Sequence, residues 1–301
     1  MYLHEDKEAF TEVIQKVQDE TGYELSIIEK DYYVSMMLKA LANADVRFVF
    51  KGGTSLSKAY KVINRFSEDI DLTVTQKPTQ GERVHMADKI MECAANIGLR
   101  IINRNDIRRR GQFNRFVFEY DSAFTKTIVN PQIIVEVFVA LLAFPVEEVR
   151  IDSFVGSILE KYNPQAQAEY DLIPFPMAVQ SIKRTLVDKI FALCDYYLSG
   201  NANKYSRHIY DIYQILMKIS LKDIDAQLIA DVRCERSKDS RCLSAQENVN
   251  LSDILTAIID TEFFKEDYNL LTRKILFDAL SYERAVTALE EIVKSNIFTQ
   301  Q

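Results

Sequence analysis

The sequence has few of the residues that build zinc sites and hydrolase triads. Its four cysteines (Cys93, Cys194, Cys234 and Cys242) form no C-x-x-C pair, and it has only three histidines (His4, His85 and His208). Scattered cysteines without metal-ligand spacing argue against a zinc site and favour inert thiols. So few histidines also argue against a Ser-His-Asp hydrolase.

Long apolar runs and chain-breaking residues are scarce as well. No stretch approaches the 18 or so uninterrupted apolar residues of a membrane span, and the first ten residues, MYLHEDKEAF, are too polar for a secretory signal. We therefore expect a cytoplasmic protein without a membrane partner. Eight glycines, six prolines and 27% charged residues are typical of an ordinary globular protein. With 301 residues and 48% hydrophobic content, the chain can bury one large core or two modest ones.

The most informative stretch is Phe48–Val74, FVFKGGTSLSKAYKVINRFSEDIDLTV. Phe48–Phe50 reads as a short buried strand that breaks at Gly52-Gly53. Glycine permits a positive φ and lets a ligand approach the main chain. Thr54, Ser55 and Lys58 then supply hydroxyls, a cation and the start of a helix, expected to continue over Lys58–Ile63, whose free N–H groups attract phosphate. This segment predicts a polyphosphate-binding loop.

Two aspartates follow in a second strand. Strand alternation over Ser67–Val74 places Asp69 and Asp71 on one face and Ile70 and Leu72 on the other. Like charges about 4 Å apart repel by roughly 4 kcal/mol at an effective dielectric near 20, so such a pair favours a bound cation. Oxygen ligands beside a phosphate loop predict Mg²⁺ or Mn²⁺.

Each piece alone has a simpler explanation. A Gly-Gly pair is usually a turn, and Asp-x-Asp is commonly a solvated strand face. Their order and spacing together are more specific. The segment is not a Walker A loop, because no Gly-Lys-Ser/Thr closes it.

These residues carry a family resemblance. Gly52-Gly53-Thr54-Ser55 followed by Asp69-x-Asp71 resembles the first motif of DNA polymerase β-like nucleotidyltransferases, and KGGTSLSKAY with RFSEDIDL resembles the AbiEii/AbiGii toxin family of bacterial toxin–antitoxin and phage-abortive systems. The likeness extends upstream to Ile28–Tyr33 and covers roughly residues 20 to 220. Glu29-Lys30-Asp31 lies at the start of an expected helix, where solvated charges are the simplest interpretation.

A third acid is expected from the strand Gln132–Leu142. It is almost wholly apolar around Glu136, and a lone buried carboxylate is costly unless it is paired or metal-bound. The superfamily generally takes a third metal-binding acid from a neighbouring strand, so the resemblance implies this role for Glu136. The alternative is a glutamate on an edge strand that reaches solvent.

The resemblance also implies two residues in the helical part. A helix lysine before Ile and the aspartate of an Arg-x-x-Tyr-Asp segment match Lys189 and Asp211. Lys189 would neutralise triphosphate charge, and Asp211 would orient a ligand or accept a hydroxyl proton. The alternative is a solvated lysine and a surface ion pair of Asp211 with Arg207. His208 stands where many relatives carry an acid, which leaves its role open.

Net charge is −7, which argues against nonspecific nucleic-acid binding by the whole surface. One stretch reverses this balance, with Arg100, Arg104, Arg108, Arg109, Arg110 and Arg115 close together. It is either a docking strip for RNA phosphates or a nucleotide triphosphate, or a solvated loop between two strands.

The remaining pattern predicts an α+β fold, with a small mixed-sheet nucleotidyltransferase core, flanking helices and a C-terminal helical domain. The expected elements are helices at 5–20, 26–42, 82–97 and 181–198 and strands at 99–103, 113–120 and 132–142. Three prolines after Pro145 suggest a boundary in 144–176, hence a nucleotidyltransferase domain at 1–165 and a helical domain at 166–301 that completes the cleft.

The resemblance implies a metal-dependent transfer of a nucleoside monophosphate (NMP) from a nucleoside triphosphate (NTP), with release of pyrophosphate. The acceptor would be an RNA, such as a tRNA 3′ end, or a protein hydroxyl, and a cognate antitoxin would restrain the enzyme. Two other functions stay open: modification of a small molecule, as in antibiotic nucleotidyltransferases, and a catalytically silent module that binds a partner.

Overall fold

The computed structural model describes residues 1–299, which form two compact units. The first unit comprises Met1–Ala59 and Glu68–Val179, and the second comprises Tyr60–Ser67 and the chain from Gln180 onward. The strand Phe175–Gln180 still belongs to the sheet, so the sheet continues past residue 166. The division into domains at 1–165 and 166–301 stays a prediction.

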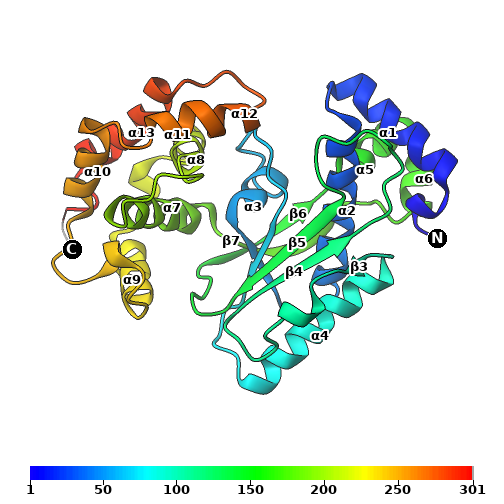
Figure 1. Cartoon of the computed structure of the whole chain (residues 1–301), viewed down its shortest axis with the longest axis horizontal. Helices are drawn as coiled ribbons and strands as arrows, with labels where there is room; N and C mark the ends of the chain where they lie inside the picture. Colours follow the sequence, from blue (N-terminus) through cyan, green and yellow to red (C-terminus); the bar gives the residue numbers. More distant parts are fainter. Residues whose placement is uncertain (300–301) are drawn as a thin grey trace. The chain divides into compact units, whose positions relative to one another are not determined.

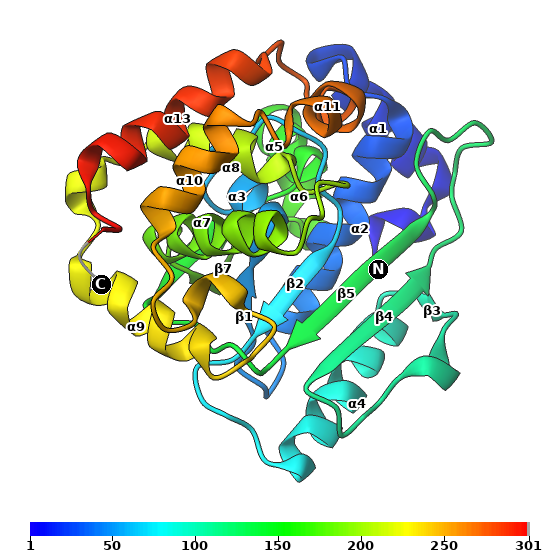
Figure 2. The same ribbon diagram turned by 60° about the vertical axis from the view of Figure 1, so that its left-hand side comes forward.

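The first unit is built on a seven-stranded sheet with the order β3-β4-β5-β2-β1-β7-β6 (Figures 1 and 2). Its strands are β1 (Val49–Lys51), β2 (Ile70–Thr73), β3 (Arg100–Ile101), β4 (Phe113–Glu119), β5 (Gln132–Phe138), β6 (Val146–Ile151) and β7 (Phe175–Gln180). β2 pairs parallel with β5 and antiparallel with β1, while β4 pairs antiparallel with β5. The predicted mixed sheet is confirmed, and β5 lies inside it rather than at an edge.

Helices α2 and α4 cover one face of this sheet (Figures 1 and 2). The helices of the unit are the short η1 (Leu3–Glu5) and η2 (Arg104–Asp106), with α1 (Lys7–Thr21), α2 (Leu25–Ala42), α3 (Gly52–Lys58), α4 (Gln80–Asn96), α5 (Phe154–Tyr162) and α6 (Pro164–Glu169). Alternate residues of β4 and β5, such as Phe116 and Val135, are fully buried on this covered face. The residues between them lie on the opposite face.

The second unit is helical. It contains α7 (Ile182–Leu198), α8 (Arg207–Leu216), η3 (Leu221–Asp223), α9 (Ala226–Ser237), η4 (Leu243–Ala245), α10 (Leu251–Asp260), α11 (Lys265–Asp267), η5 (Tyr268–Thr272), α12 (Arg273–Ile275) and α13 (Tyr282–Ser295). The segment Tyr60–Ser67 joins it through backbone hydrogen bonds from Phe66 N to Ile275 O and from Phe277 N to Asn64 O. A short piece of chain between β1 and β2 is therefore part of the helical unit.

Local chemistry explains where the principal helices begin. Asp6 accepts a hydrogen bond from Ala9 N at the start of α1, and Ser181 accepts one from Arg184 N at the start of α7. Thr79 and Glu82 form a reciprocal capping box before α4. These side chains satisfy N–H groups that have no partner inside the helix.

One expectation about the secondary structure was wrong. The helix predicted over Lys58–Ile63 instead spans Gly52–Lys58, because the glycines start the helix directly rather than forming a separate turn. The stretch 144–176 contains β6, α5, α6 and the first two residues of β7, and the domain boundary expected within it stays a prediction. Pro164 stands at the first position of α6 and Pro176 within β7, while Pro145 and Pro174 directly precede β6 and β7.

The solvated interpretation of Glu29-Lys30-Asp31 was also wrong, because these three charges of α2 lie inside the unit with polar partners. Glu29 is fully buried and accepts hydrogen bonds from Ala123 N at 2.7 Å and Ser122 Oγ at 2.6 Å. Lys30 forms an ion pair with Glu68. Asp31 forms one with Lys58 of α3 and accepts a hydrogen bond from Phe154 N at 2.9 Å.

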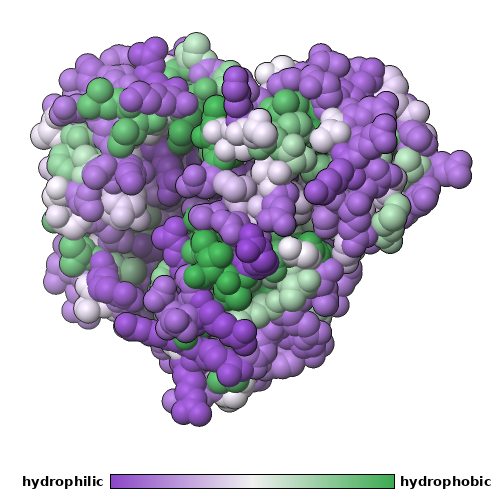
Figure 3. Space-filling view, turned by 45° about the vertical axis from the view of Figure 1, so that its right-hand side comes forward, coloured by the Kyte–Doolittle hydropathy of each residue, from purple (hydrophilic) through white to green (hydrophobic). Residues whose placement is uncertain are grey.

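Hydropathy alone does not single out a binding site on the surface. The face in Figure 3 is mostly hydrophilic, with apolar patches scattered between polar side chains. Among residues 1–299, every helix is too short or too polar to cross a bilayer. The polar side chains of the sheet are the stronger candidates for a functional site.

We expect Asp31→Ala to lower the free energy of unfolding by about 3–5 kcal/mol, because Lys58 would stay buried without its counter-ion. Asp45→Ala is the control, since Asp45 contacts His85 and Lys89 at an exposed position. Urea unfolding followed by circular dichroism measures both variants. An Asp31 variant as stable as the Asp45 variant would contradict the proposed importance of the buried pair.

Candidate active site

Four charged residues lie in one row on the face of the sheet opposite α2 and α4. Lys51 of β1 is the register partner of Asp71 in β2, Asp71 is that of Glu136 in β5, and Glu136 is that of Arg115 in β4. Neighbouring strands lie about 4.8 Å apart, so the two carboxylates stand side by side between two cations. Asp69 precedes β2 and shares the strand periodicity of Asp71.

Gly52 lies directly against Asp71. Its φ is +79°, a conformation that side chains rarely adopt, and a Cβ at this position would lie 1.9 Å from Asp71 Oδ2. Only a glycine fits here without displacing the carboxylate. The structure therefore brings together the glycine pair and the acid of the Asp-x-Asp motif.

Glu136 lies on an interior strand, so the edge-strand explanation does not apply. Its side chain is 29% exposed, and Oε1 lies 3.6 Å from Arg115 Nε. Within residues 1–299, no three Asp, Glu, His or Cys side chains are gathered closely enough to hold a metal ion. The donors nonetheless fit a hard cation, because carboxylate oxygens stand in register beside a glycine whose missing Cβ leaves room for Asp71.

The other predicted phosphate-binding residues occupy α3. Thr54 and Ser55 are buried, and Ser55 Oγ donates a hydrogen bond to Gly52 O at 2.9 Å. Lys58, at the end of α3, is buried against Asp31, with the Phe154 ring 5.7 Å from its ammonium. The ammonium of Lys58 is therefore paired with Asp31 of α2 in this structure.

Lys189 and Asp211 meet in the second unit. Lys189 Nζ donates to Asp211 Oδ2 at 2.6 Å, and both residues are buried. The guanidinium of Arg65 binds both oxygens of the same carboxylate, at 2.7 Å and 2.8 Å. The alternative of a solvated lysine and a surface pair with Arg207 was wrong, since the partners of Asp211 are Arg65 and Lys189.

The pKa of Asp211 reflects a competition. Burial raises this pKa, but the charges and hydrogen bonds of Arg65 and Lys189 outweigh burial and hold it well below its usual range. Burial and the charge of nearby Lys189 lower the pKa of His208, which keeps the imidazole neutral near pH 7. His208 Nδ1 is buried and has no hydrogen-bond partner within residues 1–299.

Sequence reasoning assigned no role to Arg65, although it stands inside the quoted RFSEDIDL motif. Arg115 was considered only as one of six arginines of a possible docking strip, not as a partner of Glu136. That stretch does connect two strands: η2 lies between β3 and β4, and Arg109 forms an ion pair with Asp88. Docking of RNA or triphosphate on it stays a prediction.

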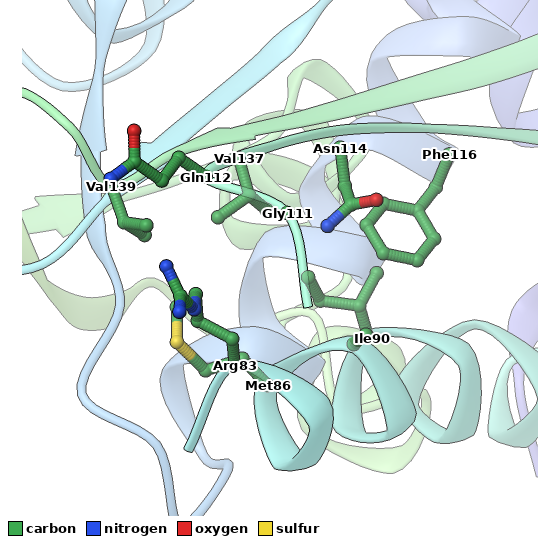
Figure 4. A pocket seen from close by; sticks show the side chains of 10 residues that line it. Arg83, Met86, Ile90, Gly111, Gln112, Asn114, Phe116, Val137 and Val139 are labelled. Atoms are coloured by element: carbon green, nitrogen blue, oxygen red, sulfur yellow. The ribbon is translucent and has the colours of Figure 1, made fainter. Parts of the chain in front are cut away.

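A small cavity lies on the covered face, away from the charged row (Figure 4). It lies between α4 and the strands β4 and β5, and Arg83, Met86 and Ile90 point toward it from the helix. Asn114 and Val137 line its sheet side, and they alternate with Arg115 and Glu136. Strand alternation therefore separates this cavity from Asp71 by the thickness of the sheet.

We expect Gly52→Ala to destabilise the protein by about 1–3 kcal/mol through backbone strain, with a further loss from the contact with Asp71. Gly22→Ala separates the two effects, because Gly22 has φ +74° but nothing within 4 Å of a Cβ. Gly81→Ala, without positive φ, should be neutral or slightly stabilising. Thermal or urea unfolding ranks the three variants, and equal losses for Gly52 and Gly22 would contradict the close approach.

Low pH should reduce the free energy of unfolding, because the Asp211 carboxylate becomes protonated. Because its pKa is lowered on folding, its stabilising contribution is present above the ordinary value of 3.8 and is lost as pH falls below it. Asp211→Asn should cost about 3–5 kcal/mol at pH 7 and flatten the decline between pH 5 and pH 3. Asp253→Asn, at an exposed position, is the control. Unfolding curves at each pH measure this, and an unchanged slope in the Asp211 variant would contradict the assignment.

Comparison with known proteins identifies the family. No curated protein matches the sequence. Among solved structures, the fold is similar to MenT4, a nucleotidyltransferase toxin from Mycobacterium tuberculosis, with a TM-score of 0.58, 16% identity, and coverage of 96% of this chain and 90% of that one. The family model of the AbiEii nucleotidyltransferase toxin of type IV toxin–antitoxin systems matches residues 37–293. The chain therefore belongs to the AbiEii toxin family and is a nucleotidyltransferase.

Proposed function

We propose that this nucleotidyltransferase moves an NMP from an NTP to a hydroxyl of an RNA, such as a tRNA 3′ end, or of a protein. Asp69, Asp71 and Glu136 would hold Mg²⁺ or Mn²⁺, and a cognate antitoxin would restrain the activity. The observation that carries the proposal is the approach of Gly52 to Asp71, with Glu136 in register on the next strand. The approach supports a site in which the carboxylates hold a cation beside a backbone segment that would bind phosphate.

The reaction forms a bond between the acceptor oxygen and the α-phosphorus and breaks the bond from that phosphorus to the β-phosphate bridging oxygen. Pyrophosphate leaves with the electron pair, and the acceptor hydroxyl loses its proton to solvent. A divalent ion held by the carboxylates would offset negative charge on the phosphate oxygens. Gly52, Gly53, Thr54 and Ser55 would place main-chain N–H groups beside the triphosphate.

The contacts of Lys189 and Asp211 favour one division of roles. A carboxylate held by two cations, with a lowered pKa, is a poor proton acceptor, so Asp211 would orient Arg65 and Lys189 rather than act as a base. Lys189 keeps further N–H donors for a phosphate oxygen. Lys58 would need to leave Asp31 before its ammonium reached a phosphate.

Two other functions compete with this proposal. A small-molecule acceptor would use the same acids, and a silent partner-binding module would not need them. Both are separated from the main proposal by supplying each of the four NTPs, labelled at the α-phosphate, with total RNA, with cellular protein, with small-molecule hydroxyl acceptors, or with none of these.

We expect Asp71→Asn to reduce label transfer at least about 100-fold, because the acid beside Gly52 would lose its charge. Asp69→Asn should behave alike, and growth inhibition on expression should be lost with both. Asp121→Asn, at a 92% exposed position, is the control that should keep wild-type activity. Circular dichroism confirms that each variant is folded.

The outcome also decides among the alternatives. Label in neither RNA nor protein, with label in a small molecule, would replace the acceptor class. Growth inhibition that survives in the Asp71 variant would instead support the silent binding module.

A further inference from the structure

The ion pair between Arg115 and Glu136 occupies a distinctive place. It is one end of the row Lys51, Asp71, Glu136, Arg115, and it joins the proposed third acid to a cation two strands away from Asp71. A metal-binding carboxylate and an arginine beside it compete, because the same oxygens cannot serve both cations fully. The Arg115–Glu136 pair therefore affects how tightly Glu136 can bind a divalent cation.

The geometry of the pair is that of an exchangeable contact. The Nε–Oε1 distance is 3.6 Å, longer than a hydrogen bond, and the two side chains are 52% and 29% exposed. Water screens such a pair, so it holds Glu136 weakly. Buried pairs of this protein, such as Arg65 with Asp211 at 2.7 Å, are much tighter.

We propose that Arg115 is the resident counter-ion of Glu136, which exchanges it for a divalent cation, and that the released guanidinium then binds phosphate oxygens of the incoming NTP. This inference rests on the proposed function. Without a cation, the guanidinium balances one of two adjacent carboxylates. With a cation bound, the guanidinium is free, and its planar fork suits phosphate oxygens.

A second arginine provides a matched comparison. Arg100 on β3 forms the same kind of cross-strand pair, with Glu119 of β4 at 2.9 Å. Neither residue belongs to the row that contains Asp71. Any effect special to Arg115 must therefore come from Glu136, rather than from losing a surface arginine.

The test measures binding without turnover. Calorimetric titration of the full chain with Mn²⁺ alone should show about 3- to 10-fold tighter binding by Arg115→Gln, because the competing cation is gone. Titration with inorganic pyrophosphate in saturating Mn²⁺ should show about 10-fold weaker binding by the same variant. Arg115→Lys should restore wild-type Mn²⁺ binding and only part of the pyrophosphate binding, since an ammonium lacks the fork.

Two variants separate failure of this inference from failure of the proposed function. Arg100→Gln should match the wild type in the Mn²⁺ titration, and Asp71→Asn should lose Mn²⁺ binding. If Asp71→Asn loses Mn²⁺ while Arg115→Gln binds Mn²⁺ no more tightly than the wild type, the exchange is overturned and the metal site stands. Wild-type protein that binds no Mn²⁺, or binds it equally in the Asp71 variant, overturns both.

Discussion

The repulsion between Asp71 and Glu136 is the constraint that governs the site. Asp71 and Glu136 are register partners on strands about 4.8 Å apart, and two carboxylates at such a separation would repel by roughly 3 kcal/mol at an effective dielectric near 20. The sheet tolerates this because the register places Lys51 beyond one acid and Arg115 beyond the other. The contact of Gly52 with Asp71 allows no side chain between backbone and carboxylate. An arrangement that keeps two like charges together and clears the space beside one of them suits a cation and a polyanion.

The second unit shows the opposite balance. One carboxylate, Asp211, is enclosed by the guanidinium of Arg65 and the ammonium of Lys189, which leaves an excess of positive charge in a buried cluster. Such a cluster is stable only while Asp211 stays ionised, which its lowered pKa ensures at neutral pH. The bidentate contact fixes the carboxylate, and the carboxylate in turn fixes Lys189. The excess positive charge is complementary to a phosphate group, just as the carboxylates of Asp71 and Glu136 are complementary to a metal ion.

The sequence allowed the acids of the sheet to be predicted, but not most of their partners. Asp69 and Asp71 alternate within an apolar strand, and Glu136 interrupts another, so local periodicity was enough to single them out. The cross-strand register that pairs Arg115 with Glu136 is set by tertiary structure, which no local pattern encodes. The same limitation explains Arg65, which lies far in sequence from Asp211, and the helix at Gly52–Lys58, where two glycines argue locally for a turn.

The charged residues of α2 were not expected to be buried. Their ion pairs hold the chain on both sides of the site, next to Asp69 and next to Gly52. Lys30 contacts Glu68, which directly precedes Asp69, and Asp31 contacts Lys58, at the end of the helix that begins with Gly52. Apolar residues of similar size would stabilise these positions at least as well, because desolvation offsets most of the attraction in a buried ion pair. A charged pair adds specificity of position, because each charged group binds one partner at one place, whereas apolar side chains can shift against one another. Two such pairs from consecutive residues of one helix tie the segment before Asp69 and the helix that begins at Gly52 to the same support. α2 thus adds a restraint to the strand register that brings Gly52 beside Asp71.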